Sequence, residues 1–365
     1  MLRIKDITSY LESIAPLSLQ ESYDNAGLIV GDPFAKVTGA LICLDSTEEV
    51  IAEAIKNKCN LVIAHHPIIF GGLKKLNGKN YVERTVMMAI KNDIAIYAAH
   101  TNLDNVSQGV NAMICSKLGL TDTQILSPKT GLLRKLVTFC PVDKAGKVRQ
   151  ALFAAGAGQI GNYDECSFNA EGFGTFRGSD DTNPYVGERG KQHRENELKI
   201  ETIFPQYLEP AVIKALLNSH PYEEVAYDIV PLGNVHPRVG SGMVGEFKKE
   251  MDEKTFLKSV KSKMECGVVR HTAFTGKKIK RVAVCGGAGS FLLKAAIGAG
   301  ADAYVSADFK YHEFFDAEGK ILVSDIGHFE SEQFTKDLFY SFLTDKFPNF
   351  AVRLTKINTN PINYF

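Results

Sequence analysis

Two adjacent histidines, His65 and His66, directly follow the apolar run NLVIA. A short apolar run of this kind is typical of a buried strand. Successive side chains of a strand point to opposite faces, so two imidazoles at its carboxyl end are candidates for binding two different metal ions. Open α/β sheets bind their ligands at the carboxyl ends of parallel strands. Taken alone, however, the pair is better explained as two hydrogen-bonded histidines in a loop.

Two further apolar runs are followed by a histidine and a carboxylate. His100 and Asp104 follow IAIYAA, and His328 and Glu332 follow ILVSDIG, each pair four residues apart. On a helix such positions share a face, so His328 and Glu332 could approach one ion, although the helix dipole alone also favours an acidic residue near a helix start. Three strand ends of this kind together favour a metal site.

The donor types indicate which metals and which chemistry to expect. Imidazole and carboxylate groups suit zinc, manganese or ferrous iron. Five such groups are too many for one four-coordinate zinc ion, but they fit two ions if one carboxylate bridges them. Sites with two metal ions typically activate water and stabilise a leaving oxygen.

The order of the predicted elements indicates how these residues are positioned. Short apolar runs alternate with helical patterns over residues 38–130, and the same alternation returns from 236. It predicts an α/β sheet with mostly parallel strands. Between them, residues 131–235 follow the order β-α-β-β-α-β of a ferredoxin-like α+β module. We therefore expect one α/β domain, 1–130 and 236–365, interrupted by an insert.

A weak internal repeat concerns the same domain. AIKNKCNLVIAHH (54–66) aligns without a gap on AIGAGADAYVSAD (296–308), with His66 opposite Asp308. A duplication would make two similar α/β halves whose strand ends meet at one site. The identity is low enough that chance explains it as well as duplication does.

Composition excludes several classes of protein. With 45% hydrophobic and 23% charged residues, the 365-residue chain has the composition of a globular protein. Lys and Arg number 42, as do Asp and Glu, so there is no basic excess to favour nucleic-acid binding. No apolar run approaches the roughly 18 residues of a membrane span. Seven cysteines without a CxxC pair indicate reduced thiols and a cytoplasmic location.

Several motifs resemble those of the GTP cyclohydrolase 1 type 2 homologues, also called the NIF-three-like family. The segments are SYDNAGLIVGDP, VIAHHPIIFGGLKKL, YAAHTNLDNVSQGVN, SADFKYHEFFDA and GHFESE. In the insert, ALFAAGAGQIGNYDECSF, GFGTFRG and SHPYEEVAYDIVPL resemble that family's PII/CutA-like module. One departure is Tyr23, where many members carry tryptophan.

The resemblance implies a dinuclear metal centre with two divalent ions (Zn, Mn or Fe) per subunit. His66 and Asp104 would bind one ion, His65 and His328 the other, and Glu332 would bridge both. It also implies a homohexamer with the metal sites facing an internal cavity. As residues that orient ligands or move protons, the candidates are His100, Asp308 and His312; ordinary loop hydrogen bonding explains Asp308 and His312 equally well.

The reaction is less defined than the metal site. The leading hypothesis is a metal-dependent hydrolase acting on a nucleotide or another phosphate-containing small molecule. The alternative is a non-enzymatic metal-binding regulator or metallochaperone whose insert docks a partner. Gly156–Gly161 is a literal GxGxxG, but it follows a helix, which is the wrong context for a dinucleotide site. Gly286–Ser290 lies between a strand and a helix, as phosphate loops do, but a structural turn explains it better.

Overall fold

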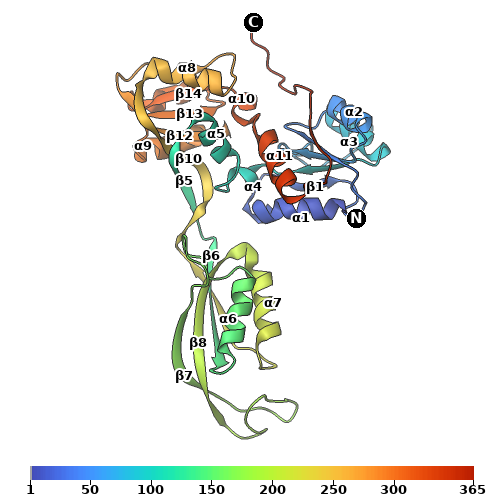
Figure 1. Cartoon of the computed structure of the whole chain (residues 1–365), viewed down its shortest axis with the longest axis vertical. Helices are drawn as coiled ribbons and strands as arrows, with labels where there is room; N and C mark the ends of the chain where they lie inside the picture. The colour runs from blue at the N-terminus through green and yellow to red at the C-terminus, as the bar shows by residue number, and fades with distance from the viewer. Residues whose placement is uncertain (1) are drawn as a thin grey trace. The chain divides into compact units, whose positions relative to one another are not determined.

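The computed structural model describes residues 2–365 and divides into two compact units. One unit comprises Met1–Pro128 with Arg238–Phe365, and the other comprises Lys129–Pro237. Figure 1 shows both units, coloured along the chain. The fold is thus mixed α/β with several sheets. No helix within residues 2–365 is long and apolar enough to cross a membrane.

The first unit contains a five-stranded sheet in the order β1-β4-β3-β2-β15. Its centre is three parallel strands that are buried along their whole length, namely β2 (Ala40–Cys43), β3 (Leu61–Ala64) and β4 (Ala95–Ala98). The edges are β1 (Gly27–Val30), antiparallel to β4, and β15 (Val352–Leu354), parallel to β2. Helices of this part are α1 (Ile4–Ile14), α2 (Glu48–Lys56), α3 (Tyr81–Lys91) and α11 (Thr335–Lys346). The apolar faces of α2 and α3 pack on β3 and β4.

A six-stranded sheet of the same unit has the order β11-β14-β13-β12-β10-β5. Again three parallel strands are adjacent, β12 (Lys278–Ala288), β13 (Ala303–Ala307) and β14 (Leu322–Asp325). The others are β5 (Thr121–Thr130), β10 (Val235–Asp252) and β11 (Arg270–His271), of which β10 and β11 run antiparallel to their neighbours β12 and β14. Helices here are α5 (Val110–Leu118), α8 (Glu253–Lys263) and α9 (Leu293–Gly298).

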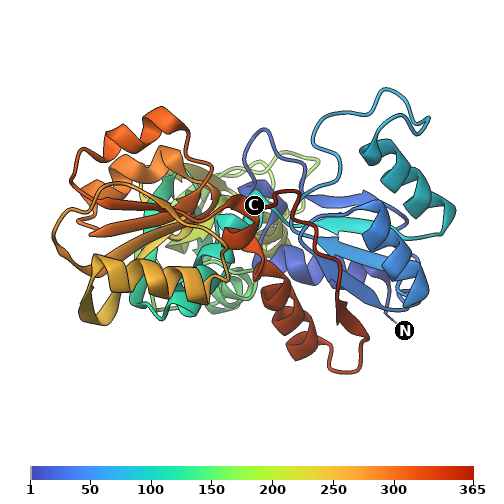
Figure 2. The same cartoon turned by 90° about the horizontal axis from the view of Figure 1, so that it is seen from above.

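Short helices start where the central strands of the two sheets end. β4 leads through His100 into α4 (Thr101–Asp104), and β14 leads into α10 (His328–Glu332). The C-terminal segment passes between the two sheets, as Figure 2 shows in dark red. The carboxyl ends of the parallel strands in both sheets and the C-terminal segment therefore surround one region of this unit.

The second unit is a four-stranded antiparallel sheet in the order β7-β8-β6-β9. Its strands are β6 (Leu133–Pro141), β7 (Phe168–Phe176), β8 (His193–Pro205) and β9 (Tyr227–Leu232). Two helices, α6 (Ala145–Ala154) and α7 (Glu209–Ser219), lie side by side on one face of the sheet (Figure 1). Their residues Val148 and Val212 share a buried core with Leu136 and Ile200.

We predict that Gly109→Ala destabilises the first unit by more than about 2 kcal/mol, because overpacking against a fixed backbone is costly. Gly109 precedes α5, and a Cβ there would lie 1.7 Å from the carbonyl oxygen of Leu103, one residue before Asp104. Urea unfolding followed by circular dichroism measures the effect. The control is Gly298→Ala in α9, where an added Cβ meets nothing within 4 Å. It is expected to leave stability unchanged or raise it by up to about 1 kcal/mol, and equal effects of the two substitutions would contradict the steric argument.

Candidate metal centre

A cavity of about 770 Å³ lies where the strand ends of the first unit meet. His66, Asp104, His328 and Glu332 line it. His65 adjoins it with a fully buried side chain. The structure therefore brings together the five residues that the motifs single out as metal ligands.

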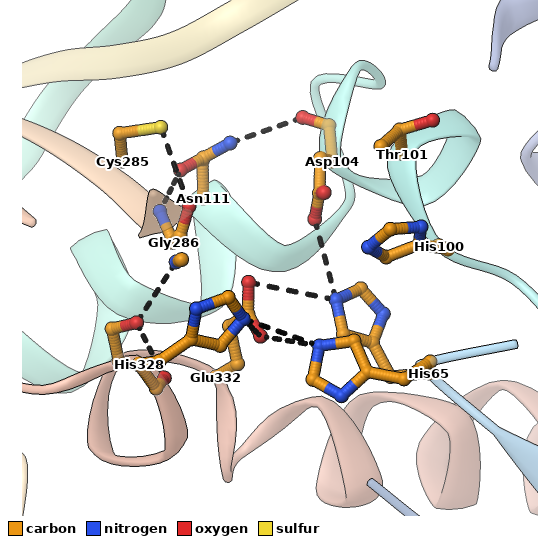
Figure 3. Close-up of polar contacts among 12 residues, drawn as sticks. His65, His100, Thr101, Asp104, Asn111, Cys285, Gly286, His328 and Glu332 are labelled. Carbon is orange, nitrogen blue, oxygen red and sulfur yellow. Dashed lines mark hydrogen bonds and ion pairs between the residues drawn. The ribbon is translucent and has the colours of Figure 1, made fainter. Parts of the chain in front are cut away.

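Glu332 is the centre of this cluster, and its side chain is only 3% exposed. Its Oε2 lies 3.0 Å from Nε2 of His66 and 3.1 Å from Nε2 of His328, while its Oε1 lies 3.7 Å from Nε2 of His65. Figure 3 shows the carboxylate between the imidazoles of His328 and His65. One carboxylate thus presents its two oxygens to different histidines, which is the arrangement that a bridging ligand needs.

The ligand atoms gather into two groups that share Glu332. His65, Asp104 and Glu332 form one group, and His66, His328 and Glu332 form the other, with all ligand atoms of a group within 4.8 Å of one another. This grouping differs from the expected pairing of His66 with Asp104 and of His65 with His328. A third group of the same kind contains His100 with His65 and His66.

Hydrogen bonds on the far side of each imidazole explain the grouping. His65 Nδ1 donates to the carbonyl oxygen of Ala99 (2.9 Å), which turns its Nε2 toward Asp104. His66 Nδ1 bonds to Asp45 Oδ1 (2.7 Å), which leaves its Nε2 beside Glu332. Such outer hydrogen bonds fix the tautomer and the orientation of histidine ligands.

Asp308 does the same for His328, through a 2.7 Å contact between Oδ2 and Nδ1. Asp308 has a φ of +58°, a left-handed conformation that non-glycine residues rarely adopt. Of the three supporting residues that the sequence singles out, Asp308 therefore contacts a candidate ligand directly. His100 has its ring 5.3 Å from that of His65. His312 is exposed, stacks with Phe315 and meets Tyr311 edge-on, and it does not line the cavity.

Sequence reasoning missed three supporting residues, Asp24, Asp45 and Thr359. Asp24 accepts hydrogen bonds from His100 Nδ1 (2.8 Å) and from Thr101. Thr359 donates to Asp45 Oδ2 (2.6 Å). Asp45 follows the strand β2, so the rule that identified the histidines could also have identified it. Nothing in the sequence connects Asp45 with Thr359, 314 positions away.

The cluster shifts the pKa values of its members strongly. Burial opposes a charge on His66 and His328, but the neighbouring carboxylates outweigh it and raise the pKa of His66 to about 9 and that of His328 to about 11. Burial lowers the pKa of His65, which favours the neutral imidazole. Burial and the charge of Glu332 raise the pKa of Asp104, whereas the interactions of Glu332 with His328 and His65 outweigh burial and hold the pKa of Glu332 well below its usual range.

Two buried atoms of the cluster lack hydrogen-bond partners. Nε2 of His65 and Oδ1 of Asp104 are 3.7 Å apart, and neither makes a hydrogen bond to any residue in the described range 2–365. Buried polar atoms are normally paired, because an unpaired one costs about 1–3 kcal/mol. A divalent cation between them would satisfy both, and the imidazole and carboxylate donors suit zinc, manganese or ferrous iron. The residues therefore fit a metal site.

The raised histidine pKa values predict that the metal-free protein loses stability as the pH rises. The folded-state pKa values of His66 (about 9) and His328 (about 11) lie above the usual 6.5. Their stabilising contribution is therefore complete below pH 6.5 and is lost as the pH passes through about 9 and then 11. We expect the free energy of unfolding to fall by several kcal/mol between pH 7 and 10, at about 1.4 kcal/mol per pH unit for each histidine below its folded-state pKa and less for the more exposed His328.

Chemical denaturation in a chelating buffer measures this slope. The His328→Gln variant should show a shallower slope, while His312→Gln should follow the wild type. A wild-type slope no steeper than that of His328→Gln would contradict the assignment.

Comparisons with known proteins agree with the expected family. The model of the family Duf34/NIF3 (NGG1p interacting factor 3) matches residues 2–361. A Bacillus subtilis (strain 168) protein named GTP cyclohydrolase 1 type 2 homolog is 38% identical over 366 residues, covering 99% of this chain and 98% of that protein. The crystal structure of a Bacillus cereus protein related to NIF3 has a TM-score of 0.87 at 38% identity, covering 100% of this chain and 99% of that one. The crystal structure of the Staphylococcus aureus protein SA1388 has a TM-score of 0.79 at 31% identity, covering 100% of this chain and 99% of that one. The match over nearly the full length confirms that the chain belongs to the Duf34/NIF3 family.

Proposed function

We propose that the protein is a dinuclear, divalent-metal-dependent hydrolase acting on a nucleotide or another small phosphate-containing molecule. The observation that carries this proposal is Glu332, a buried carboxylate shared by two groups of ligand atoms. His65 and Asp104 would complete the site of one ion, and His66 and His328 that of the other. The metal would be zinc, manganese or iron, with two ions per subunit.

When bound, two such ions supply Lewis acidity, which activates water and offsets the charge of a leaving oxygen. The chain itself would supply a group that holds or transfers a proton, His100. Burial opposes the charge of Asp24, but hydrogen bonds from His100 and Thr101 outweigh it and lower the pKa of Asp24 to about 2. The ionised carboxylate then fixes the Nδ1–H tautomer of His100, which leaves Nε2 as a proton acceptor. His100 lines the cavity beside His65 and His66, where a substrate would lie.

The substrate class rests on the relatives. The Bacillus subtilis relative is named for its likeness to an enzyme that acts on GTP. Hydrolytic opening of a purine ring is chemically compatible with a site that activates water. We carry over only the coarse class, a nucleotide or related phosphate compound.

We further propose an assembly and an origin for the fold. Residues 131–235 would be a ferredoxin-like, PII/CutA-like insert, and the remainder two similar halves related by duplication. Support comes from the parallel triplets β2-β3-β4 and β12-β13-β14, of which β4 and β14 are each followed by a histidine and a carboxylate four residues apart. The protein would be a cytoplasmic homohexamer, as the family resemblance implies.

The test is Glu332→Gln, which keeps the shape of the side chain but removes the bridging charge. We expect the wild type to retain two divalent ions per chain after gel filtration, and the variant to retain fewer than one. Metal-dependent hydrolysis of nucleotides should fall at least about a hundredfold, a loss of about 2.7 kcal/mol in transition-state stabilisation. Elemental analysis and phosphate or product assays measure both effects.

The matched control is Glu330→Gln in the same helix. Glu330 is also buried, but its carboxylate accepts a hydrogen bond from Asn360 and belongs to none of the candidate metal groups. It should keep both metal ions and activity. Retention of two ions by Glu332→Gln would refute the ligand assignment. Full metal content without turnover of any phosphate compound would favour a metal-binding regulator or metallochaperone instead.

A further inference from the structure

Apart from the histidines, the charged side chains that line the metal cavity are all acidic. Four carboxylates line it, those of Glu21, Asp45, Asp104 and Glu332. Among the lining residues in the described part of the chain there is no lysine and no arginine. Two divalent cations would bring four positive charges, of which the carboxylates of Asp104 and Glu332 in the candidate metal groups would compensate two, so that about two remain for a substrate. A bound substrate with several negative charges would therefore find no further cation in the wall of this cavity.

Backbone amides do not replace the missing cations. Gly286 and Gly287 border the cavity near the end of β12, where the register with β13 shifts, and this is the position of a phosphate loop. However, the Gly286 amide donates to Asn111 Oδ1 (3.0 Å) and the Gly287 amide to Ser331 Oγ (2.9 Å). The amides of these two glycines are thus occupied by side chains of the protein and cannot cradle a phosphate.

The helix α2 also starts beside the cavity, at Thr47. Thr47 caps the helix by accepting from the Val50 amide, and the first turn carries Glu48 and Glu49. These carboxylates already occupy the positive end of the helix dipole and repel a further anion. Polyphosphates are usually held by arginine, lysine, magnesium and free amides together, and the wall of this cavity lacks most of them.

Aromatic rings, in contrast, are abundant in the cavity wall. Tyr23, Phe70, Tyr81 and Phe291 line it and are 69%, 54%, 60% and 68% exposed. They come from four separate segments, and Phe70 meets the ring of His100 edge-on with 5.5 Å between centroids. Large exposed rings around a concave site gain free energy when a flat ligand covers them.

Tyr23 connects these rings with the metal cluster. Partial desolvation, followed by the charges of Glu21, Asp24 and Asp104, raises the pKa of the largely exposed Tyr23 phenol. The phenol therefore stays protonated at neutral pH and is a neutral hydrogen-bond donor near the acidic end of the cavity. Together, the lining residues offer stacking surfaces and a neutral donor, but no lysine or arginine for phosphate.

We infer that the cavity binds a flat aromatic or heteroaromatic substrate that carries at most one phosphate group, and that it discriminates against nucleoside triphosphates. This inference rests on the proposed metal-dependent hydrolase and defines its substrate class. A single phosphate ester carries about two negative charges, which the metal ions alone can meet. Each additional phosphate adds charge that this cavity leaves unpaired, and desolvated unpaired charge is strongly unfavourable.

The experiment uses 2-aminopurine riboside and its 5′-monophosphate and 5′-triphosphate. The chain has no tryptophan, so the fluorescence of this base can be followed over a low protein background. Each probe is titrated against the full-length protein loaded with zinc and, in a second arm, against the metal-free protein. We expect quenching by stacking, with the monophosphate binding at least about tenfold more tightly than the triphosphate to the loaded protein. Zinc content measured after each titration separates binding from chelation.

Two substitutions test the two halves of the inference. Phe291→Ala should weaken binding of the riboside and the monophosphate about tenfold, as loss of a stacking ring does, while Phe315→Ala, equally exposed but outside the cavity, should have no effect. Ala288 lines the cavity and is exposed, so Ala288→Arg should add the missing cation and raise triphosphate affinity about tenfold relative to the monophosphate.

Equal or tighter binding of the triphosphate to the wild type would overturn the inference, as would absence of quenching by all three probes. So would a Phe291→Ala variant that changes the oligomeric state but not probe binding, because the rings would then belong to an interface between copies. Failure of the proposed function has a different signature. In that case Glu332→Gln keeps its metal ions, or no phosphate compound is turned over, whatever the probes bind.

Discussion

The buried carboxylate of Glu332 is the constraint on which the rest of the first unit depends. A charged group taken out of water costs several kcal/mol unless partners compensate it. Its partners come from β3, through His65 and His66, and from its own helix, through His328. The strand ends of two sheets must therefore meet within hydrogen-bonding distance. Gly287 shows how closely they do, because a Cβ there would lie 2.5 Å from Glu332 Oε1, and its φ is +61°.

The need to orient these histidines also constrains the residues that form hydrogen bonds with the far side of each imidazole ring. Asp45 fixes His66, and Thr359 in turn binds the other oxygen of Asp45. The C-terminal segment thus contributes to the site through a hydrogen bond rather than through a metal ligand. Asp308 accepts the hydrogen bond of His328 while its own backbone is in a strained, left-handed conformation. Such a conformation persists only where the surrounding structure stabilises it. These contacts select one nitrogen of each ring, so the outer layer decides which ligand atoms face each other.

Local patterns in the sequence predict much of the site, because strand ends carry a local signature. Each of the apolar runs before His65, His100 and His328 contains a strand, namely β3, β4 and β14. The helical spacing of His328 and Glu332 is also observed, within α10. The grouping of the ligands was not predictable in this way, since it depends on hydrogen bonds of His65 to Ala99 and of His66 to Asp45, residues that lie far from the histidines in sequence. The strand β10 was missed as well, because its glycines and its one proline, Pro237, interrupt the alternation that marks strands.

The pKa values of Asp104 and Glu332 shift in opposite directions. These shifts indicate that the cluster is suited to binding cations and not to stabilising the folded protein. Both carboxyl groups lie beside His65, at 3.7 Å, and each disfavours the charge of the other. Without a cation, either Asp104 is protonated or its charge and that of Glu332 repel each other. In addition, two buried atoms, His65 Nε2 and Asp104 Oδ1, have no hydrogen-bond partner among the residues described. An apolar core of the same volume would avoid both costs. Natural sequences break the rules of local consistency mainly at functional sites. A divalent cation resolves the repulsion and the unpaired atoms at once, so the residues that destabilise the empty cluster are those that would bind the metal.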